Sequence, residues 1–268
     1  MINWFSSSSE QQITEQTMAI ANEFYHLLKL CIPWEMDHDV ALDEPFDQRL
    51  YTDQIRALTN KILGMDPNET LKFGGSMPFS MSRRNLEVVL RNDYYVTEKT
   101  DGVRYLLFVV KGEKRESEAV LFDRSCKVRI LRGSPLVAKA LGMNTVLDGE
   151  LVYDSVEKKT VFLVFDVLAI DGESVCGKPF RTRLNHLEGE VGRRCKFAAS
   201  EAQRAAMDAI NLIMKNFLPK KDLRVLLGRI KVEGMSKTYR ERDKENRVRQ
   251  QVWMNERMSE FVCVYVCV

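Results

Sequence analysis

The sequence predicts an α/β (α+β) protein in which twisted, mainly antiparallel sheets are flanked by helices. β-prone apolar runs fill the middle of the chain and are punctuated by Asp-Gly turns, whereas segments with helical spacing lie on either side. With 268 residues, 45% of them apolar, the chain is long enough to bury a full core. The β-prone runs are 94–96, 105–110, 119–122, 127–131, 145–153 and 161–170.

Two helices are predicted before the first strand. Residues 10–30 carry apolar side chains at helical spacing, and packing against a core is the first interpretation of that face. A polar, Pro-containing linker over 33–49 follows. The second helix covers 52–63 and is ended by Gly64 and Pro67.

Asp-Gly dipeptides predict how the strands connect. Asp101-Gly102 lies between the first two runs and is typical of a β-hairpin turn. The runs 119–122 and 127–131 form a second expected strand pair. Further Asp-Gly pairs lie inside 145–153 and directly after 161–170.

In the rest of the chain we expect a helical region over 181–217, a strand over 224–232 and a charged helix over 240–258. Residues 261–268 are apolar and β-prone, which is typical of an edge strand that needs cover. A chain that stops there looks cut off. We therefore expect an N-terminal helical extension and linker (1–50), a main domain incomplete at its C-terminal end (51–260) and an apolar tail (261–268).

Charge and cysteine content exclude several classes of protein. A net charge of +2 means that any contact with a polyanion depends on a local patch. The six cysteines include no C-x-x-C pair, and Cys263 and Cys267 have no His or Cys partners nearby, so a metal site is not favoured. The sequence has no secretory signal and no apolar run near the roughly 18 residues of a membrane span.

The residues from Glu98 to Arg104 carry the strongest chemical signal. A strand end, a tight turn and a new strand let Lys99 and Arg104 converge on one pocket. A lysine beside apolar walls or other cations loses proton affinity and becomes a nucleophile, and an arginine offers forked donors to phosphate or sugar. A solvated surface hairpin is the alternative interpretation of this segment.

Further polar residues follow in order on apolar strands. Glu150 lies within the run 145–153, and buried carboxylates are seldom left unpaired. Phe165 and Asp166 interrupt the next run, where an aromatic ring is able to stack on a base. Together with Lys99 they favour a nucleotide pocket over separate structural roles.

This order of motifs resembles the covalent nucleotidyltransferase superfamily of mRNA capping guanylyltransferases and polynucleotide ligases. The match is closest to the capping enzymes, whose nucleophile motif K-[TA]-D-G-x-R is similar to residues 99–104, with Thr100 in place of the aromatic residue that many ligases carry. Segments 73–80, 121–124 and 179–191 resemble other capping-enzyme motifs, so the likeness covers about residues 53–239.

The resemblance implies that Lys99 takes GMP from GTP as a lysyl-GMP phosphoramidate and passes it to the 5′-diphosphate end of RNA. Thr100, Arg104, Glu150 and Phe165 would bind the nucleotide, with Phe165 stacked on guanine. Mg²⁺ (or Mn²⁺) would offset charge on the triphosphate. Asp166 would be near the metal or structural, and the metal ligands themselves stay unknown.

The same resemblance implies lysine-bearing strands and an oligonucleotide-binding (OB) fold after residue 239, and neither is expected in this sequence. Glu233 to Lys237 could be taken for the first of those lysine-bearing strands. It is more similar to the basic strand and helix that precede that strand in capping enzymes. A ligase using ATP or NAD and a catalytically inactive nucleotide- or RNA-binding fragment stay open as alternatives. A nuclear location, and an RNA triphosphatase, a cap methyltransferase or the RNA polymerase II tail as partners, are further expectations.

Overall fold

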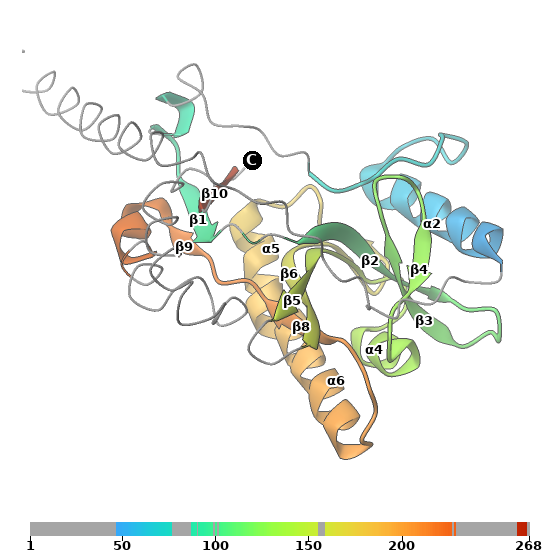
Figure 1. The fold of residues 1–268 in the computed structure, drawn as a ribbon. Coiled ribbons are helices and arrows are strands. Elements are labelled where there is room, and N and C mark those ends of the chain that lie inside the picture. The colour runs from blue at the N-terminus through green and yellow to red at the C-terminus, as the bar shows by residue number, and fades with distance from the viewer. Residues whose placement is uncertain are drawn as a thin grey trace, which may run out of the picture.

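Two β-sheets organise the chain, with helices against the larger one (Figure 1). The structure is a computed structural model that describes residues 47–76, 87–89, 91–98, 100, 102–154, 159–226, 228 and 262–266. The predicted helices over 10–30 and 240–258 lie outside these residues. The predicted architecture of mainly antiparallel sheets flanked by helices is confirmed.

The larger sheet has seven strands. Six run antiparallel in the order β4-β3-β2-β5-β6-β7, and β8 pairs in parallel with β6. Apart from bulges between β5 and β6, alternate side chains point to opposite faces, so both faces can be buried. The strands are β2 (Val103–Lys111), β3 (Ser117–Phe122), β4 (Val128–Ile130), β5 (Val146–Asp154), β6 (Lys159–Ile170), β7 (Glu173–Ser174) and β8 (Asn211–Met214).

Each face of this sheet has its own core. One core contains Leu107, Leu121 and Leu147 and is covered by α4 (Ser134–Leu141), α5 (Phe180–His186), the π-helical turn η1 (Leu187–Val191) and α6 (Gly192–Arg204). The other contains Leu106, Phe108 and Phe122 and is covered by α2 (Gln48–Leu63). In Figure 1, α2 lies beside β2 and β4, and α6 lies on the other side of the sheet.

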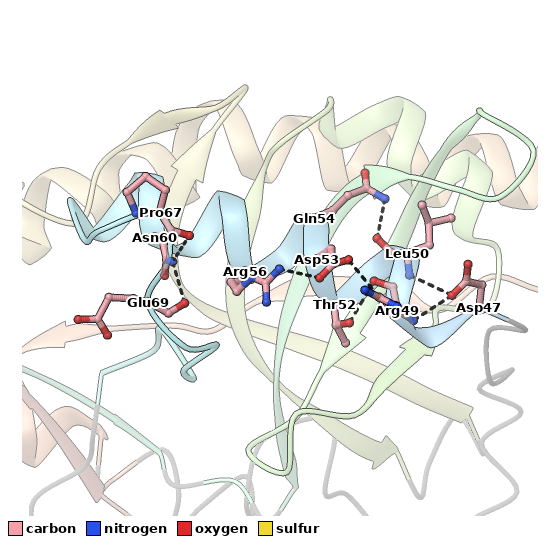
Figure 2. Close-up of polar contacts among 10 residues, drawn as sticks. All are labelled: Asp47, Arg49, Leu50, Thr52, Asp53, Gln54, Arg56, Asn60, Pro67 and Glu69. Atoms are coloured by element: carbon pink, nitrogen blue, oxygen red, sulfur yellow. Dashed lines mark hydrogen bonds and ion pairs between the residues drawn. The ribbon is translucent and has the colours of Figure 1, made fainter.

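Helix α2 has defined signals at both ends, and it begins a turn earlier than predicted. The Asp47 carboxylate accepts hydrogen bonds from the backbone N–H groups of Arg49 and Leu50 at 3.0 and 3.1 Å (Figure 2). Gly64 ends the helix in the left-handed conformation, with φ of 64°. The Asn60 side-chain amide then donates to the carbonyls of residues 66, 67 and 69, which fixes the following loop against the helix.

The smaller sheet has three strands in the order β10-β1-β9, and it corrects one prediction. These are β1 (Tyr94–Glu98), β9 (Leu218–Pro219) and β10 (Val262–Val266). The predicted hairpin between the first two β-prone runs is wrong, because β1 and β2 belong to different sheets. Both edges of β1 are taken by β9 and β10, and both edges of β2 by β3 and β5. The β-prone character of 261–268 is confirmed over 262–266.

The prediction of a continuous helix over 181–217 is wrong beyond Arg204. Ala206 takes a positive φ of 49°, and residues 211–214 form β8 along the open edge of β6. Burial there follows a period of two, with Leu212 buried and Ile213 41% exposed. Met207, a predicted core residue, is 48% exposed. The predicted strand over 224–232 is also wrong at its start, since residues 223–226 are helical.

Two sequence-based exclusions can be compared with the described part of the chain. No helix in that part is long and apolar enough to cross a membrane. Cys126, Cys176 and Cys195 carry free thiols. Cys263 lies on β10, and Cys267 lies outside the described residues.

A short 3-10 helix, η2 (Lys220–Asp222), follows β9 and brings a lysine back to β1. The Lys220 ammonium donates to the carbonyls of Val89 and Asn92 at 2.8 and 2.7 Å and lies 6.0 Å from the centre of the Tyr94 ring. These contacts tie the chain before β1 to the chain after β9.

Candidate functional site

A β-bulge in the centre of the large sheet shapes the candidate site. Asp148 on β5 pairs with Asp166 on β6, but the next residue, Gly149, pairs with Val164. Phe165 is therefore the extra residue of the bulge, and such bulges re-aim side chains beside functional sites. A side chain at Gly149 would collide with the Leu163 carbonyl at 2.6 Å, so the close approach of β5 and β6 requires glycine.

Arg104 and Asp148 form a buried, two-pronged ion pair across β2 and β5. The Arg104 Nε–H donates to Asp148 Oδ1 at 2.9 Å, and Nη2 donates to Oδ2 at 2.5 Å. The side chains are 14% and 1% exposed. Two parallel hydrogen bonds fix the plane of the guanidinium, which a single contact would leave free to turn.

Two aromatic rings hold the same guanidinium. Its central carbon lies 5.2 Å from the centre of the Phe73 ring and 5.4 Å from the centre of the Phe165 ring. Gly75, two residues after Phe73, packs directly on the ion pair. A Cβ atom there would lie 2.7 Å from both Arg104 Nη2 and Asp148 Oδ2. The segment 71–76 is thus closely fitted to this pair.

The Asp148 carboxyl has an unusual acidity. Complete burial raises its pKa from 3.8 to about 6, even though the ion pair with Arg104 acts to lower it. The negative charges of Asp166 and Glu150 add to the increase. The charge on Asp148 is therefore sensitive to pH close to the neutral range.

A second group of polar residues, joined by hydrogen bonds, links the segment after β1 to β5 and to the residue after β8. The Thr100 hydroxyl donates to Glu150 Oε2 and accepts a hydrogen bond of 2.9 Å from the Lys215 ammonium. Thr100 is 3% exposed and Lys215 is 7% exposed. The Lys215 backbone N–H donates to the Val164 carbonyl at 2.8 Å, which fixes this lysine beside the bulge.

Phe165 joins the two groups of polar residues. The Lys215 ammonium lies 5.9 Å from the centre of its ring, and the Arg104 guanidinium lies 5.4 Å from it. The ring is 4% exposed. The ring face attracts both cations, so Phe165 connects the Arg104 ion pair with the Thr100 and Lys215 group.

Asp166 is held by a different arginine. It accepts two hydrogen bonds, of 2.8 and 3.0 Å, from Arg183 on α5, and their side chains are 5% and 11% exposed. Arg183 also donates to the Lys178 carbonyl ahead of the helix. Of the two roles predicted for Asp166, this anchoring of α5 to β6 favours the structural one.

The structure brings together four of the residues predicted from sequence, namely Thr100, Arg104, Glu150 and Phe165. Arg104 and Glu150 are direct cross-strand partners on β2 and β5. The predicted nucleophile, Lys99, lies outside the described residues, although its neighbours Glu98 and Thr100 are described.

Three further residues of this group were missed by the sequence-based prediction: Phe73, Asp148 and Lys215. Asp148 lies two residues before Glu150 on the same apolar strand. This pair of carboxylates was the sequence signal that could have identified Asp148. Phe73 was noted only within a motif. Lys215 could not be found, because its segment was assigned to a helix and the parallel pairing of β8 with β6 depends on tertiary structure.

Comparison with known proteins gives a consistent result. The family model described as "mRNA capping enzyme, catalytic domain" matches residues 36–239. The mRNA-capping enzyme subunit alpha of Neurospora crassa is 36% identical over 149 residues, which are 51% of this chain and 36% of that protein. The Schizosaccharomyces pombe subunit alpha is 35% identical over 134 residues, which are 45% of this chain and 33% of that protein. The chain thus spans about a third of the length of these relatives.

Among solved structures, that of a Chlorella virus DNA ligase-adenylate is 15% identical with a TM-score of 0.36, and the match covers 58% of this chain and 54% of that chain. A TM-score this low adds no weight to the assignment. The family model, in contrast, matches well over half of the residues and includes every residue of the group described above. This chain belongs to the mRNA capping enzyme catalytic-domain family.

Proposed function

We propose that this chain is the nucleotidyl-transfer part of an mRNA guanylyltransferase, which moves GMP from GTP to the 5′-diphosphate end of RNA through Lys99. The observation that carries the proposal is the buried cluster of Thr100, Glu150 and Lys215 against Phe165. Thr100 directly follows Lys99 in sequence, so a nucleotide bound at this cluster lies within reach of the predicted nucleophile.

The reaction has two balanced steps. The neutral Lys99 amine attacks the α-phosphorus of GTP, a P–N bond forms, the bond to the bridging oxygen breaks, and pyrophosphate leaves while the amine loses a proton. A terminal oxygen of the RNA 5′-diphosphate then attacks the same phosphorus. The new P–O bond forms, the P–N bond breaks and Lys99 regains its proton. Such transfers depend mainly on positioning and on compensation of charge.

The polar atoms near Phe165 favour guanine over adenine. The Lys215 ammonium is a donor only, and it lies beside the ring on which a purine would stack. Guanine presents a carbonyl acceptor, O6, at the position where adenine presents an amino donor. A buried ammonium facing an amino group would lose a hydrogen bond, so the site should discriminate strongly between the two bases.

Charged residues around the ring would bind the rest of the nucleotide. Arg104 would contact the ribose or the phosphates, since its guanidinium is held by the Asp148 carboxylate and lies near two aromatic rings at this position. Glu150 would accept from the ribose or take part in the metal shell.

The carboxylates fit a magnesium site built largely by the substrate. The described residues contain no group of three or more His, Cys, Asp or Glu side chains arranged to hold a metal. Asp148 and Asp166 each accept two hydrogen bonds from an arginine, which leaves Glu150 as the carboxylate able to hold Mg²⁺ together with triphosphate oxygens. Bound there, the ion would offset negative charge on the phosphates.

A labelling experiment tests the proposal. The protein is incubated with Mg²⁺ and either α-labelled GTP or α-labelled ATP, and covalent label is measured on a denaturing gel. We expect label from GTP that is absent in Lys99→Ala, and a shift towards ATP in Lys215→Met. Label from ATP alone would indicate a ligase, and no label from either would indicate a catalytically inactive fragment.

The proposal extends to location and partners. The substrate would be the 5′ end of newly made RNA, so we propose a nuclear location with an RNA triphosphatase, a cap methyltransferase or the RNA polymerase II tail as partners. The relatives are named as alpha subunits of capping enzymes, which supports a multi-subunit assembly. Imaging of a tagged full-length chain together with co-purification checks both points.

A further inference from the structure

Phe73 makes contacts that packing alone does not require. One side of its environment is apolar, because the ring stacks on Phe122 with centres 6.4 Å apart and planes 14° from parallel. It also lies against two guanidinium groups, with Arg104 at 5.2 Å and Arg124 at 5.9 Å from its centre. Any apolar residue would satisfy the first contact, but only an aromatic face attracts the cations.

Phe73 also completes the surroundings of Arg104. Asp148 holds the guanidinium through two hydrogen bonds, and Phe73 and Phe165 attract the same group through their ring faces. Gly75 brings the backbone of the same segment onto the ion pair, where no side chain fits. The three constraints come from three distant parts of the sequence and meet on one side chain.

We propose that Phe73 is a positioning residue, which acts through Arg104 to hold the guanidinium ready for the nucleotide. This inference rests on the proposed function, since Arg104 is taken to contact the ribose or phosphates of GTP. An arginine that is ordered before the ligand arrives loses less side-chain entropy on binding. Removing the aromatic face should therefore weaken GTP binding without preventing the chemistry at Lys99.

Phe108 provides a matched control on the same core. It contacts Phe122 at 6.1 Å, as Phe73 does at 6.4 Å, but its ring makes no cation contact within the described residues. Phe108→Leu and Phe73→Leu each remove one ring from the Phe122 cluster. A purely structural role for Phe73 predicts that the two variants behave alike in GTP binding.

The test measures the Kd of GTP by calorimetry in the Lys99→Ala background, so that no adduct forms. We expect Phe73→Leu to raise Kd about tenfold, Phe73→Tyr to restore it to within about twofold, and Phe108→Leu to lower the melting temperature without a change in Kd. With Arg104→Ala also present, Phe73→Leu should change Kd by less than about twofold, because the pair acts as a unit.

The inference is overturned if Phe73→Leu leaves Kd unchanged, if Phe108→Leu raises it equally, or if the effect of Phe73→Leu persists without Arg104. Failure of the proposed function looks different. In that case the protein with Lys99 intact forms no GMP adduct, whatever the ranking of the binding constants.

Discussion

Two facing carboxylates on the central strands, Asp148 and Asp166, are used in different ways. They are direct cross-strand partners on β5 and β6, and each accepts two hydrogen bonds from an arginine. The arginine of Asp148 comes from the neighbouring strand β2 and contacts both rings of the candidate site. The arginine of Asp166 comes from helix α5. One ion pair is thus part of the candidate site, and the other anchors a helix.

The two ion pairs differ in what surrounds the arginine, and these surroundings indicate the role of each pair. Arg183 contacts the Phe180 ring and the Lys178 carbonyl, both from its own end of α5. Arg104 contacts Phe73 and Phe165, which come from separate segments, and Phe165 also contacts Lys215, the partner of Thr100. Removing either carboxylate should cost stability, but only the Asp148 pair should affect the nucleotide.

The largest expected effect on stability belongs to the helix-anchoring pair. Asp166→Ala leaves the Arg183 guanidinium buried without its carboxylate, which costs roughly 3–5 kcal/mol of unfolding free energy. Thermal and urea unfolding measure this loss. The KM for GTP in adduct formation should stay at the wild-type value at a temperature where the variant is folded. A raised KM would show that Asp166 belongs to the nucleotide site.

Asp148→Asn should separate binding from stability. The amide keeps the shape of the carboxyl but loses its charge and one acceptor, so Arg104 is less firmly held. We expect the KM for GTP to rise about tenfold and the unfolding free energy to fall by about 1–3 kcal/mol. Steady-state adduct formation measures the KM, and urea unfolding measures the free energy of unfolding. An unchanged KM would make this pair equivalent to that of Asp166.

The pH dependence offers a smaller effect with a defined sign. Burial raises the pKa of Asp148 from 3.8 to about 6, so ionisation is easier in the unfolded chain. The stability contribution of this group is complete below pH 3.8 and is lost as the pH rises through about 6. GTP binding should follow the opposite trend, because the ionised carboxylate holds Arg104 more firmly.

Measurements of Kd for GTP and of unfolding between pH 5 and 7 check these trends, with Asp148→Asn as the control. We expect Kd to fall about threefold over this range in the parent protein, as the charged hydrogen bonds to Arg104 strengthen, and to stay flat in the variant. An equal slope in both proteins would assign the pH dependence to another group.

The smallest effect is expected far from both ion pairs. Asp47→Ala removes the N-cap of α2 and should cost about 1 kcal/mol of unfolding free energy with no change in KM for GTP. Urea unfolding is precise enough to detect this. A change in KM would show that α2 communicates with the site, since it covers the core below Phe73.

Local patterns in the sequence were sufficient for much of the fold and of the site. The β-prone apolar runs identified the central strands correctly, and the helical spacing with Gly64 identified α2. Thr100, Arg104, Glu150 and Phe165 were found because motif order brought them together. The failures that affect the site involve long-range pairing. The partners of β1, the parallel strand β8 and hence Lys215 depend on which sheet edges are open, and no local spacing contains that information.

We propose that Lys99 carries GMP beside the buried cluster of Thr100, Glu150 and Lys215, in which Lys215 reads the guanine. The most direct test is to react the protein with GTP and Mg²⁺, digest it and locate the nucleotide by mass spectrometry under conditions that preserve phosphoramidates. We expect GMP on the peptide that contains Lys99 and on no other lysine. GMP on Lys215, or on a lysine outside the motif 99–104, would contradict it.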